Sequence, residues 1–402
     1  NHPNPELRLA DGPLTLATEL RPWSVPDGVP RRAGVSALGV GGTNAHVVLE
    51  EAPPRLAAPA PHLPVLVPVS ARDGQSLSEL TSQLRDRLRQ QPELSAADVA
   101  ATLAGGRPHR AARTTAVGRT ADDLARALAE PWHPPAAPLG PVAFAFSGQG
   151  SAVRGMASGL YAGYPAARQA LERCAEIYAD EFGGALLPLL LDGVATEGAG
   201  QDVWPTETAQ AALFAHQAAL ADVWRAAGVR PALVLGHSVG EFAALYAAGA
   251  LTLQDGLRLT AWRGRLMHAA CPPGGMLAVR TDRSTAERVA RAAGASLAVV
   301  NGPRAQVISG LPRAVEEAVR LLDLEGLRWR ALPVDRAFHS AAIEPALGEF
   351  RARAGEVTYR PLHTPLVTAA DGEVRRAGWR VDADYLRRQA RQPVRFDVAM
   401  AA

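Results

Sequence analysis

The clearest strand signal in the chain is the apolar run 233–235, which leads directly into Gly-x-Ser-x-Gly at 236–240. The apolar, alanine-rich segment 242–248 that follows predicts a helix. A serine on so sharp a turn is held exposed, and the flanking glycines remove side chains that would clash there. The N-terminus of the helix offers backbone N–H groups and a favourable dipole to an oxyanion. The pattern therefore predicts a nucleophile elbow that carries Ser238.

Residues 275–337 show a second regular pattern. The expected elements are strand 276–279, helix 285–293, strands 297–300 and 305–309, helix 314–324 and strand 329–334. The resulting order βαββαβ is ferredoxin-like. We expect a small inserted subdomain that lies against a larger sheet, with a cleft between the two where a ligand site forms.

The N-terminal third is organised more loosely. Residues 1–54 contain several prolines and one apolar segment, 34–50, which predicts a tight loop that feeds a strand. Proline-rich stretches at 52–61 and 131–141 are typical of linkers. Between them lies a small α/β unit without candidate chemistry, with the expected order of strand 64–70, helices 76–90 and 96–103, strand 114–118 and helix 121–129.

Composition narrows the functional class. The chain has 402 residues, of which 48% are hydrophobic and 20% charged, which is enough for a core divided over two to four domains. A formal charge of +2 and scattered arginines argue against binding to nucleic acid or to an anionic membrane. Cys174 and Cys271 form neither a metal pattern nor a disulfide framework, so we expect no metal and a reducing compartment.

Both chain ends and the hydropathy pattern add expectations about context. The first residue is Asn1, and the last residues stop inside a predicted helix, which indicates part of a longer protein. No apolar run reaches the length of a membrane span, and there is no signal peptide. These features predict a cytoplasmic protein.

A second glycine-rich turn, taken together with the elbow, resembles a known family. Strand 142–146 ends in Gly148-Gln149-Gly150, and together with Gly-His-Ser-Val-Gly it resembles the malonyl/acyl-CoA:acyl-carrier-protein transacylases. The resemblance implies an α/β fold with a hydrolase-like parallel-sheet core. It also implies an oxyanion hole formed by the backbone amides of Gln149 and Val239. Ala152 departs from the family, which commonly has a second glutamine there.

A serine nucleophile needs a base, and two histidines are candidates. His237 is adjacent in sequence, but neighbouring side chains on a strained elbow point apart. His339, in the segment 334–340, can approach from another element, and the resemblance assigns the base to it. The family orients this base with a backbone carbonyl near the residue that matches Gln389, whereas a hydrolase would use a carboxylate, for which Asp335 is the alternative.

Three further residues bear on the acyl group. Arg263 lies in Arg-Gly-x-x-Met, where the resemblance implies pairing with the malonyl carboxylate, and a planar guanidinium suits two charge-assisted bonds. On spacing alone, Arg263 and Arg265 could form a solvated face. Phe338 stands in Arg-Ala-Phe-His, which resembles the malonyl-type His-Ala-Phe-His rather than the methylmalonyl-type Tyr-Ala-Ser-His. We also place His237 among the substrate-binding residues.

The N-terminal segments carry a related resemblance. Residues 41–46, Gly-Gly-Thr-Asn-Ala-His, with 1–5 upstream, look like the C-terminal end of a β-ketoacyl synthase. The chain has no matching nucleophilic cysteine, so His46 is interpreted as structural. We therefore expect a ketosynthase remnant at 1–54, a ketosynthase–acyltransferase linker domain at 55–140, and an acyltransferase domain at 141–402 that is truncated at its C-terminus.

The predicted function is that of a polyketide synthase acyltransferase. Malonyl would pass from malonyl-CoA through Ser238 to the phosphopantetheine thiol of an acyl carrier protein. The implied partners are malonyl-CoA, the carrier protein, and the ketosynthase and other domains of the parent synthase, and the chain itself would bind no cofactor. The alternatives are methylmalonyl or another acyl-CoA as donor, a serine esterase, and a non-catalytic docking fragment.

Overall fold

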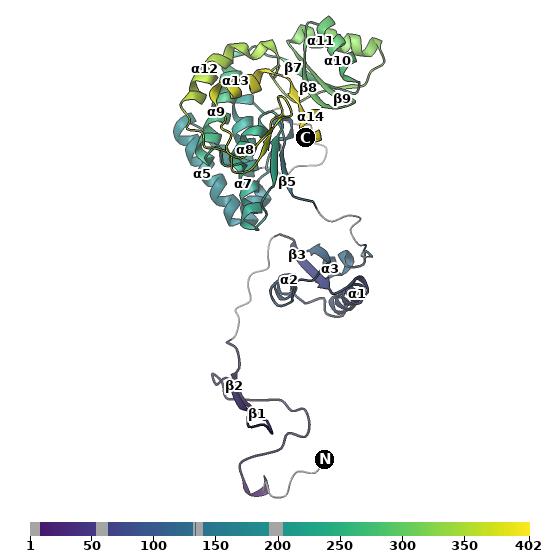
Figure 1. Cartoon of the computed structure of the whole chain (residues 1–402), viewed down its shortest axis with the longest axis vertical. Coiled ribbons are helices and arrows are strands. Elements are labelled where there is room, and N and C mark those ends of the chain that lie inside the picture. Colours follow the sequence, from purple (N-terminus) through teal and green to yellow (C-terminus); the bar gives the residue numbers. More distant parts are fainter. Residues whose placement is uncertain (1–8, 54–62, 132, 134–139, 193–203) are drawn as a thin grey trace. The chain divides into compact units, whose positions relative to one another are not determined.

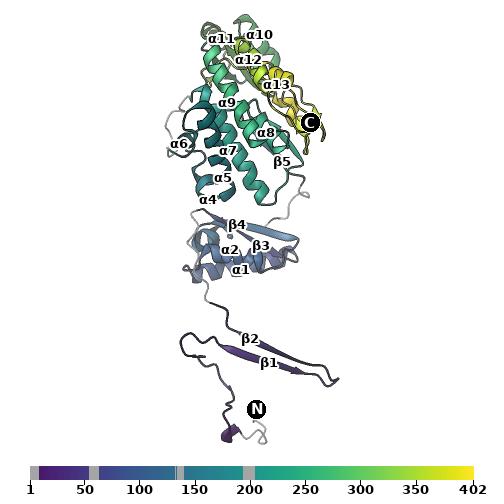
Figure 2. The same ribbon diagram turned by 90° about the vertical axis from the view of Figure 1, so that its left-hand side faces the viewer.

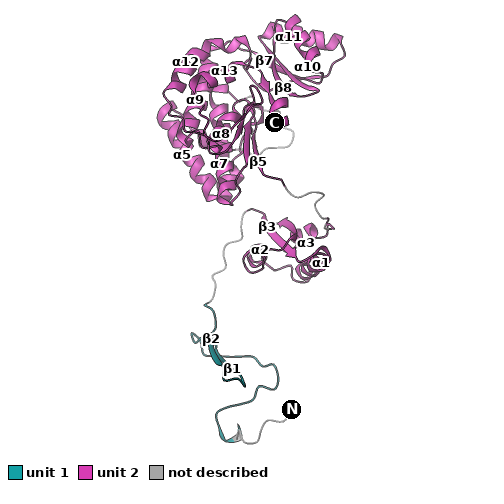
Figure 3. Ribbon diagram, viewed as in Figure 1, with its two compact units in different colours: residues 1–60 teal, residues 61–402 magenta. Residues whose placement is uncertain are grey.

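The computed structural model describes residues 9–53, 63–131, 133, 140–192 and 204–402. The chain divides into two compact units, residues 1–60 and 61–402 (Figure 3). The predicted linkers at 52–61 and 131–141, and the segment 1–5 used in the ketosynthase resemblance, lie mostly or wholly outside the described residues.

The first unit is a β-hairpin. Strands β1 (Arg32–Leu38) and β2 (Asn44–Glu50) pair antiparallel, and a backbone bond of 3.0 Å from Gly39 N to Thr43 O closes the turn. The sequence predicted one strand preceded by a loop. That prediction missed β1, whose glycine, serine and alanines are weak strand formers that become ordered by pairing with β2. His46 lies on the hairpin, with Nδ1 2.8 Å from Ser36 Oγ.

The small α/β unit has the predicted elements. Strand β3 (Val65–Ala71) pairs antiparallel with β4 (Ala112–Gly118), and the helices α1 (Gly74–Gln90), α2 (Ala96–Gly105) and α3 (Ala121–Ala127) pack on them (Figure 2). The helices begin where polar side chains cap free amides, as Asp73 does for α1 and Thr120 for α3. Buried aliphatic residues from both layers form a separate core.

The main sheet has the order β12-β11-β6-β5, with parallel pairing among β5, β6 and β11. Its strands are β5 (Ala143–Phe146), β6 (Leu233–Gly236), β11 (Leu366–Val367) and β12 (Val374–Arg375). The surrounding helices are α4 (Ser158–Gly163), α5 (Pro165–Phe182), α6 (Leu186–Leu191), α7 (Thr206–Ala226), α8 (Gly240–Ala247), α9 (Leu253–Ala270), α12 (Glu344–Gly355) and α13 (Ala383–Arg391). This arrangement is the parallel-sheet α/β core that the sequence predicted.

Helices α7 and α9 approach each other closely because small residues lie between them. A Cβ on Gly256 would lie 2.3 Å from the Phe214 ring, and one on Gly264 would lie 2.5 Å from Thr206 O. A side chain at Gly264 would collide with the backbone of α7, and one at Gly256 would displace the buried Phe214 ring. The two glycines therefore let α7 and α9 bring their polar residues together beneath the site.

The ferredoxin-like subdomain has the sheet order β10-β7-β9-β8-β13. Its elements are β7 (Gly275–Val279), α10 (Arg283–Ala292), β8 (Ser296–Gly302), β9 (Ala305–Gly310), α11 (Pro312–Leu324), β10 (Trp329–Ala331) and β13 (Val394–Arg395). Six of these form the predicted βαββαβ unit, and β13 adds an unpredicted fifth strand parallel to β8. Helices α10 and α11 cover the outer face of this sheet, away from α9 and α13 (Figure 1).

The chain ends in α14 (Phe396–Ala401), which packs against β8. Within the described ranges, none of the helices combines the length and the apolar character needed to cross a bilayer.

Candidate active site

The turn between β6 and α8 is tight enough to require both of its glycines. A Cβ on Gly236 would lie 2.3 Å from Glu241 Cα, and one on Gly240 would lie 2.5 Å from the carbonyl oxygens of Phe146 and Ser147. Between them, Ser238 has a φ of 53°, a left-handed conformation that costs free energy in a residue with a side chain. The strain is the local consequence of the strand-to-helix turn and holds the serine at its apex.

His339 shares this unusual conformation, with a φ of 55°. Among the described non-glycine residues, only Ser238 and His339 have a positive φ. Their side chains meet, since Ser238 Oγ lies 2.8 Å from His339 Nε2. This is hydrogen-bond distance for a nucleophile and its base. Residues that are 101 positions apart thus form a pair in which both backbones are strained.

The other nitrogen of His339 identifies the carbonyl that orients the ring. His339 Nδ1 lies 2.8 Å from the backbone oxygen of Gln392. The sequence placed this role at Gln389, and the structure moves it three residues later. Gln389 lies within α13, whereas Gln392 follows the helix with extended backbone, so its carbonyl can turn toward the imidazole. Gln389 instead donates from Nε2 to Ser238 O at 2.8 Å and so supports the elbow backbone.

The two alternative partners weighed from the sequence lie elsewhere. His237 Nε2 is 3.0 Å from Asn301 Oδ1, and its ring packs edge to face on Phe396 with centroids 5.2 Å apart. Asp335 accepts a hydrogen bond from Thr206 and lies 3.5 Å from His268 Nδ1. Neither residue replaces His339 or orients it in this structure.

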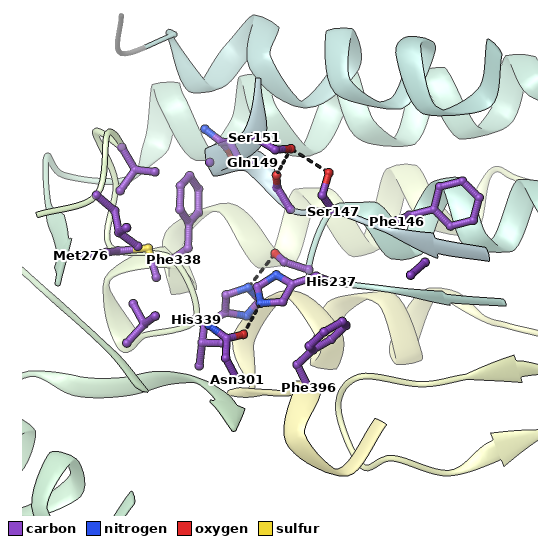
Figure 4. A pocket seen from close by; sticks show the side chains of 18 residues that line it. Phe146, Ser147, Gln149, Ser151, His237, Met276, Asn301, Phe338, His339 and Phe396 are labelled. Carbon is purple, nitrogen blue, oxygen red and sulfur yellow. Dashed lines mark hydrogen bonds between the residues drawn. The ribbon is translucent and has the colours of Figure 1, made fainter. Parts of the chain in front are cut away.

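A cavity of about 490 Å³ opens over the Ser238–His339 pair. Five predicted residues line it, namely Gln149, His237, Ser238, Phe338 and His339. Apolar side chains from both subdomains complete the wall, including Met276 and Phe396 (Figure 4). Val239, Arg263 and Gln389 are not among the residues that line the cavity, and all three are buried. The cavity is the expected cleft between the main core and the ferredoxin-like subdomain.

The two predicted oxyanion donors lie at helix starts. Gln149 opens the short helix η3 (Gln149–Ser151), directly after β5, and Val239 precedes α8. Amides at such positions have no acceptor within their own helix, so they are suited to bind an oxyanion. A Cβ on Gly148 would lie 2.8 Å from His237 Nδ1, which shows how closely the two loops approach.

Arg263 is fully buried on α9, at 1% exposure. Nη1 donates to Gln210 Oε1 at 2.6 Å, while Nε and Nη2 have no hydrogen-bond partner among the described residues. Burial lowers the pKa of Arg263 to about 10, so the group stays charged at neutral pH. A buried guanidinium with one edge unpaired is costly unless an anion completes it. The free edge is suited to a carboxylate.

Sequence analysis missed the polar chain that joins Arg263 to the glycine-rich turn. Gln210 Nε2 donates to Gln149 Oε1 at 3.1 Å, and Gln149 Nε2 donates to Thr206 Oγ1 at 3.2 Å. Thr206 in turn bonds to Asp335, in the segment before His339. The available signal was that the polar residues Thr206 and Gln210 lie one turn apart, and so on one face, of an alanine-rich helix that is largely buried.

We predict that Gln210→Leu raises the KM for the acyl donor about 10- to 100-fold, because losing a hydrogen bond to a buried charge costs about 1.5–3 kcal/mol. The substitution frees Arg263 Nη1 and removes the bond to Gln149. Steady-state kinetics would test this, with Gln217→Leu as a matched control on the same helix. Equal effects of the two substitutions would contradict a specific role for Gln210.

A buried carboxyl also lies beneath the elbow. Glu241 accepts a hydrogen bond from Tyr385 Oη, and Gln389 Nε2 lies 3.5 Å from its other oxygen. Burial raises the pKa of Glu241 to about 7. The carboxyl therefore links α8, which begins beside the Ser238–His339 pair, to α13, which ends beside it.

Burial and the nearby charge of Arg263 lower the pKa of His339 to about 3. The imidazole is therefore neutral, and able to accept a proton, well below pH 6.5. We predict that kcat/KM stays level from pH 7.5 to 5.5, where a histidine of ordinary pKa would lose about tenfold. Acylation rates across this range would show it. The pH profile of Glu241→Gln would show whether titration of that carboxyl contributes. A fall in kcat/KM near pH 6.5 in both the wild type and Glu241→Gln would contradict the prediction.

Among the described residues, no group of three or more histidine, cysteine or acidic side chains is placed to hold a metal ion.

Two family matches cover nearly the whole chain. Residues 143–402 match the family described as "Acyl transferase domain", and residues 3–113 match the "Ketoacyl-synthetase C-terminal extension". Among curated proteins, the chain is 38% identical over 427 residues to the spectinabilin polyketide synthase system protein NorA' of Streptomyces orinoci. It is 39% identical over 426 residues to the polyketide synthase GfsB of Streptomyces halstedii.

These matches cover the full chain but only 11% and 7% of the two relatives. Solved structures are similar as well. The acyl transferase domain of SpnD, in complex with 2-(pent-4-yn-1-yl)malonyl, is 31% identical at a TM-score of 0.74, with 84% of this chain and 81% of that one covered. The acyltransferase domain from module 8 of the salinomycin polyketide synthase is 33% identical at a TM-score of 0.71, with 84% and 82% covered.

Proposed function

The chain belongs to the acyl transferase domain family and is the acyltransferase of a modular polyketide synthase, and on this premise we propose that it moves a malonyl extender unit from coenzyme A to an acyl carrier protein. The observation that carries the proposal is Arg263, a buried cation with an unpaired edge whose charge acts on His339 of the Ser–His pair. A neutral acyl group would leave that edge unsatisfied, whereas the free carboxylate of malonyl would complete it.

The first half-reaction is acylation of the serine. Ser238 Oγ attacks the thioester carbonyl and passes its proton to His339 Nε2, while the Gln392 carbonyl fixes the ring through Nδ1. The amides of Gln149 and Val239 stabilise the oxyanion, and the loss of one such donor typically costs about 100- to 1000-fold in rate. The C–S bond then breaks, and coenzyme A leaves as its thiol with the proton from His339.

The second half-reaction runs in the opposite sense. The phosphopantetheine thiol of the carrier protein gives its proton to His339 and attacks the ester carbonyl. The Ser238 oxygen leaves and recovers that proton, so the enzyme is regenerated. The phosphopantetheine belongs to the carrier, and this scheme needs no cofactor on the chain itself. Water would compete at the same ester, and the apolar cavity wall opposes its entry.

The extender unit is proposed from Phe338. Its side chain is 5% exposed and lines the cavity beside the reacting pair, where it would crowd a substituent on the acyl α-carbon. Arg336, which replaces the first histidine of the malonyl-type tetrapeptide, turns away from the cavity and donates to His268 O at 2.6 Å. Phe338 is therefore the residue of this segment that bears on acyl size.

Intact-protein mass spectrometry after brief exposure to malonyl-CoA or methylmalonyl-CoA tests the proposal, with Ser238→Ala as the control. We expect a malonyl adduct that is absent from the control and exceeds the methylmalonyl adduct under competition. A methylmalonyl preference would retain the acyltransferase and overturn the extender assignment. The absence of any adduct from folded protein would favour the docking-fragment alternative.

We predict that Phe338→Ser shifts selectivity toward methylmalonyl-CoA about 10- to 100-fold, because one methyl group in such a pocket is worth about 1–3 kcal/mol. The ratio of kcat/KM for the two donors, measured in competition, gives the shift directly. Phe338→Tyr keeps the ring and serves as the matched control. A similar change in both variants would show that volume at this position does not set the choice.

The proposal includes the parent assembly. We assign 1–54 to the end of a ketosynthase, 55–140 to the linker domain and 141–402 to the acyltransferase, with a cytoplasmic location for the reaction. The ketosynthase and the carrier protein are then partners within the same synthase. The domain assignments are supported by the family matches and by the separate core of the α/β unit at 65–128.

A further inference from the structure

A groove with four arginines continues the wall of the active-site cavity. It is formed by the ends of β7 and β10 and the β8–β9 turn, and we call it the arginine groove after Arg280, Arg304, Arg328 and Arg330. Asn301 lines both the arginine groove and the cavity over Ser238, so the two are contiguous. In coenzyme A and in a carrier protein alike, the thiol that bears the acyl group stands at the end of a long pantetheine arm, and the other end of this arm carries phosphate. The surface next to the cavity is therefore where that phosphate would lie when the thioester is at Ser238.

The alternation of strand residues shows that the cavity wall and the arginine groove share one face of the sheet. On β7, Met276 lines the cavity and Ala278 lines the arginine groove, as does Arg280 directly after the strand. On the neighbouring strand β10, Arg330 lines the arginine groove, and Leu332, directly after the strand, lines the cavity. Side chains two apart on a strand point the same way, so each strand presents an apolar residue near Ser238 and an arginine farther out.

The antiparallel register brings these arginines together. Arg330 pairs with Ala278, and Arg280 N donates to Arg328 O at 2.9 Å. Arg280 therefore lies beside Arg328 and Arg330 at one end of the sheet. Arg280 is four positions after Met276, which corresponds to about 13 Å at 3.3–3.4 Å per residue of extended chain. The face thus changes from apolar to basic over a distance that suits an extended pantetheine arm.

The charges of the arginine groove are not neutralised within the protein. In the described ranges, none of the four guanidinium groups has a hydrogen-bond or ion-pair partner. Nearby carboxylates are engaged elsewhere: Asp323 accepts from Trp329 Nε1 at 2.8 Å, and Glu325 pairs with Arg288 at 2.6 Å. Four exposed like charges repel one another unless an anion joins them, and the guanidinium fork matches phosphate oxygens.

We propose that the arginine groove binds the phosphate groups of the acyl-CoA donor while its pantetheine arm runs along the apolar face to Ser238. The proposal rests on the proposed acyl-CoA function and adds the subsite that recognises the donor's anionic end. Several phosphate charges on coenzyme A match four arginines better than the single phosphodiester of a carrier arm does. The chain then distinguishes the donor from the acceptor by charge at a distance from the reacting bond.

Binding measurements can test the arginine groove without any transfer reaction. Titration calorimetry would compare coenzyme A, dephospho-coenzyme A and pantetheine on the wild-type chain and on Arg280→Gln/Arg330→Gln. We expect the double variant to bind coenzyme A about 10- to 100-fold more weakly, the range for losing charge-assisted bonds. Pantetheine, which lacks phosphate, should bind both proteins equally. A matched control, Arg291→Gln/Arg313→Gln, removes the same charge from α10 and α11 on the other face of the sheet.

The possible outcomes distinguish failure of the phosphate-binding proposal from failure of the proposed transfer function. Equal binding of coenzyme A to the double variant and to the control would overturn the phosphate assignment, and so would an equal loss for pantetheine. A second experiment measures transfer of malonyl from the loaded enzyme to a carrier protein. If the double variant is defective only in this step, the arginine groove binds the carrier protein instead. If coenzyme A binding needs the arginines but no malonyl–Ser238 adduct forms, the groove stands and the proposed transfer fails.

Discussion

His339→Gln is expected to slow acylation of Ser238 by malonyl-CoA about 10²- to 10⁴-fold, the range for removing a positioned general base. Nε2 of the imidazole lies 2.8 Å from Ser238 Oγ and is its base in the proposed mechanism. Glutamine keeps a polar group of similar size but cannot accept the proton. Rapid-quench single-turnover experiments with intact-mass detection would measure acylation apart from carrier binding.

The neighbouring histidine supplies the control for this variant. His237→Gln removes an imidazole that bonds to Asn301 rather than to the serine, so we expect a much smaller loss of acylation rate. If the two variants lost rate equally, the base assignment would fail. Residual acylation in His339→Gln should persist at a low level, because the oxyanion donors and donor binding remain.

The elbow could be predicted because its determinants are local. Gly236 and Gly240 are required by backbone atoms within five residues or on the adjacent loop, and the serine lies between them. The βαββαβ subdomain was likewise readable from alternation and helix periodicity. Its sheet order follows from the connection rules for that motif, and four of its five strands occur in the predicted unit.

The features that the sequence did not predict depend on contacts between residues that are far apart in the sequence. The carbonyl that orients His339 comes from Gln392, 53 residues away, and its position is set by where α13 ends. Strand β13 joins the ferredoxin-like sheet from the C-terminal segment, which no local pattern indicates. The series of hydrogen bonds from Thr206 through Gln149 and Gln210 to Arg263 requires contact between α7 and α9. No local sequence pattern indicates that contact.

The strained pair also links fold to function. Ser238 and His339 each adopt the left-handed conformation, which costs about 1–3 kcal/mol per residue and persists only where surrounding packing imposes it. Glu241, Tyr385 and Gln389 provide that packing beneath the elbow. Rigid support of this kind fixes the distance between nucleophile and base before the donor binds.

Arg263→Met is expected to lower kcat/KM for malonyl-CoA about 30- to 5000-fold, because removing one partner of a desolvated charge pair costs about 2–5 kcal/mol. Acylation by acetyl-CoA, which has no carboxylate, should not fall and should gain relative to malonyl-CoA. The measurement is the ratio of initial acylation rates for the two donors. Arg265→Met, on the same helix but bonded to Phe182 O at 3.1 Å, is the matched control.

The same substitution separates binding from folding. In the described structure, Arg263 keeps a buried charge with two unpartnered nitrogens, so an apolar side chain of similar length removes a desolvation cost. We therefore expect the thermal midpoint of Arg263→Met to stay level or rise while malonyl transfer is lost. Loss of both donors together with a lower midpoint would mean that the arginine serves the core instead. Arg263→Lys, which keeps the charge but not the planar fork, should recover only part of the malonyl rate, since a single ammonium cannot make the paired bonds of a guanidinium.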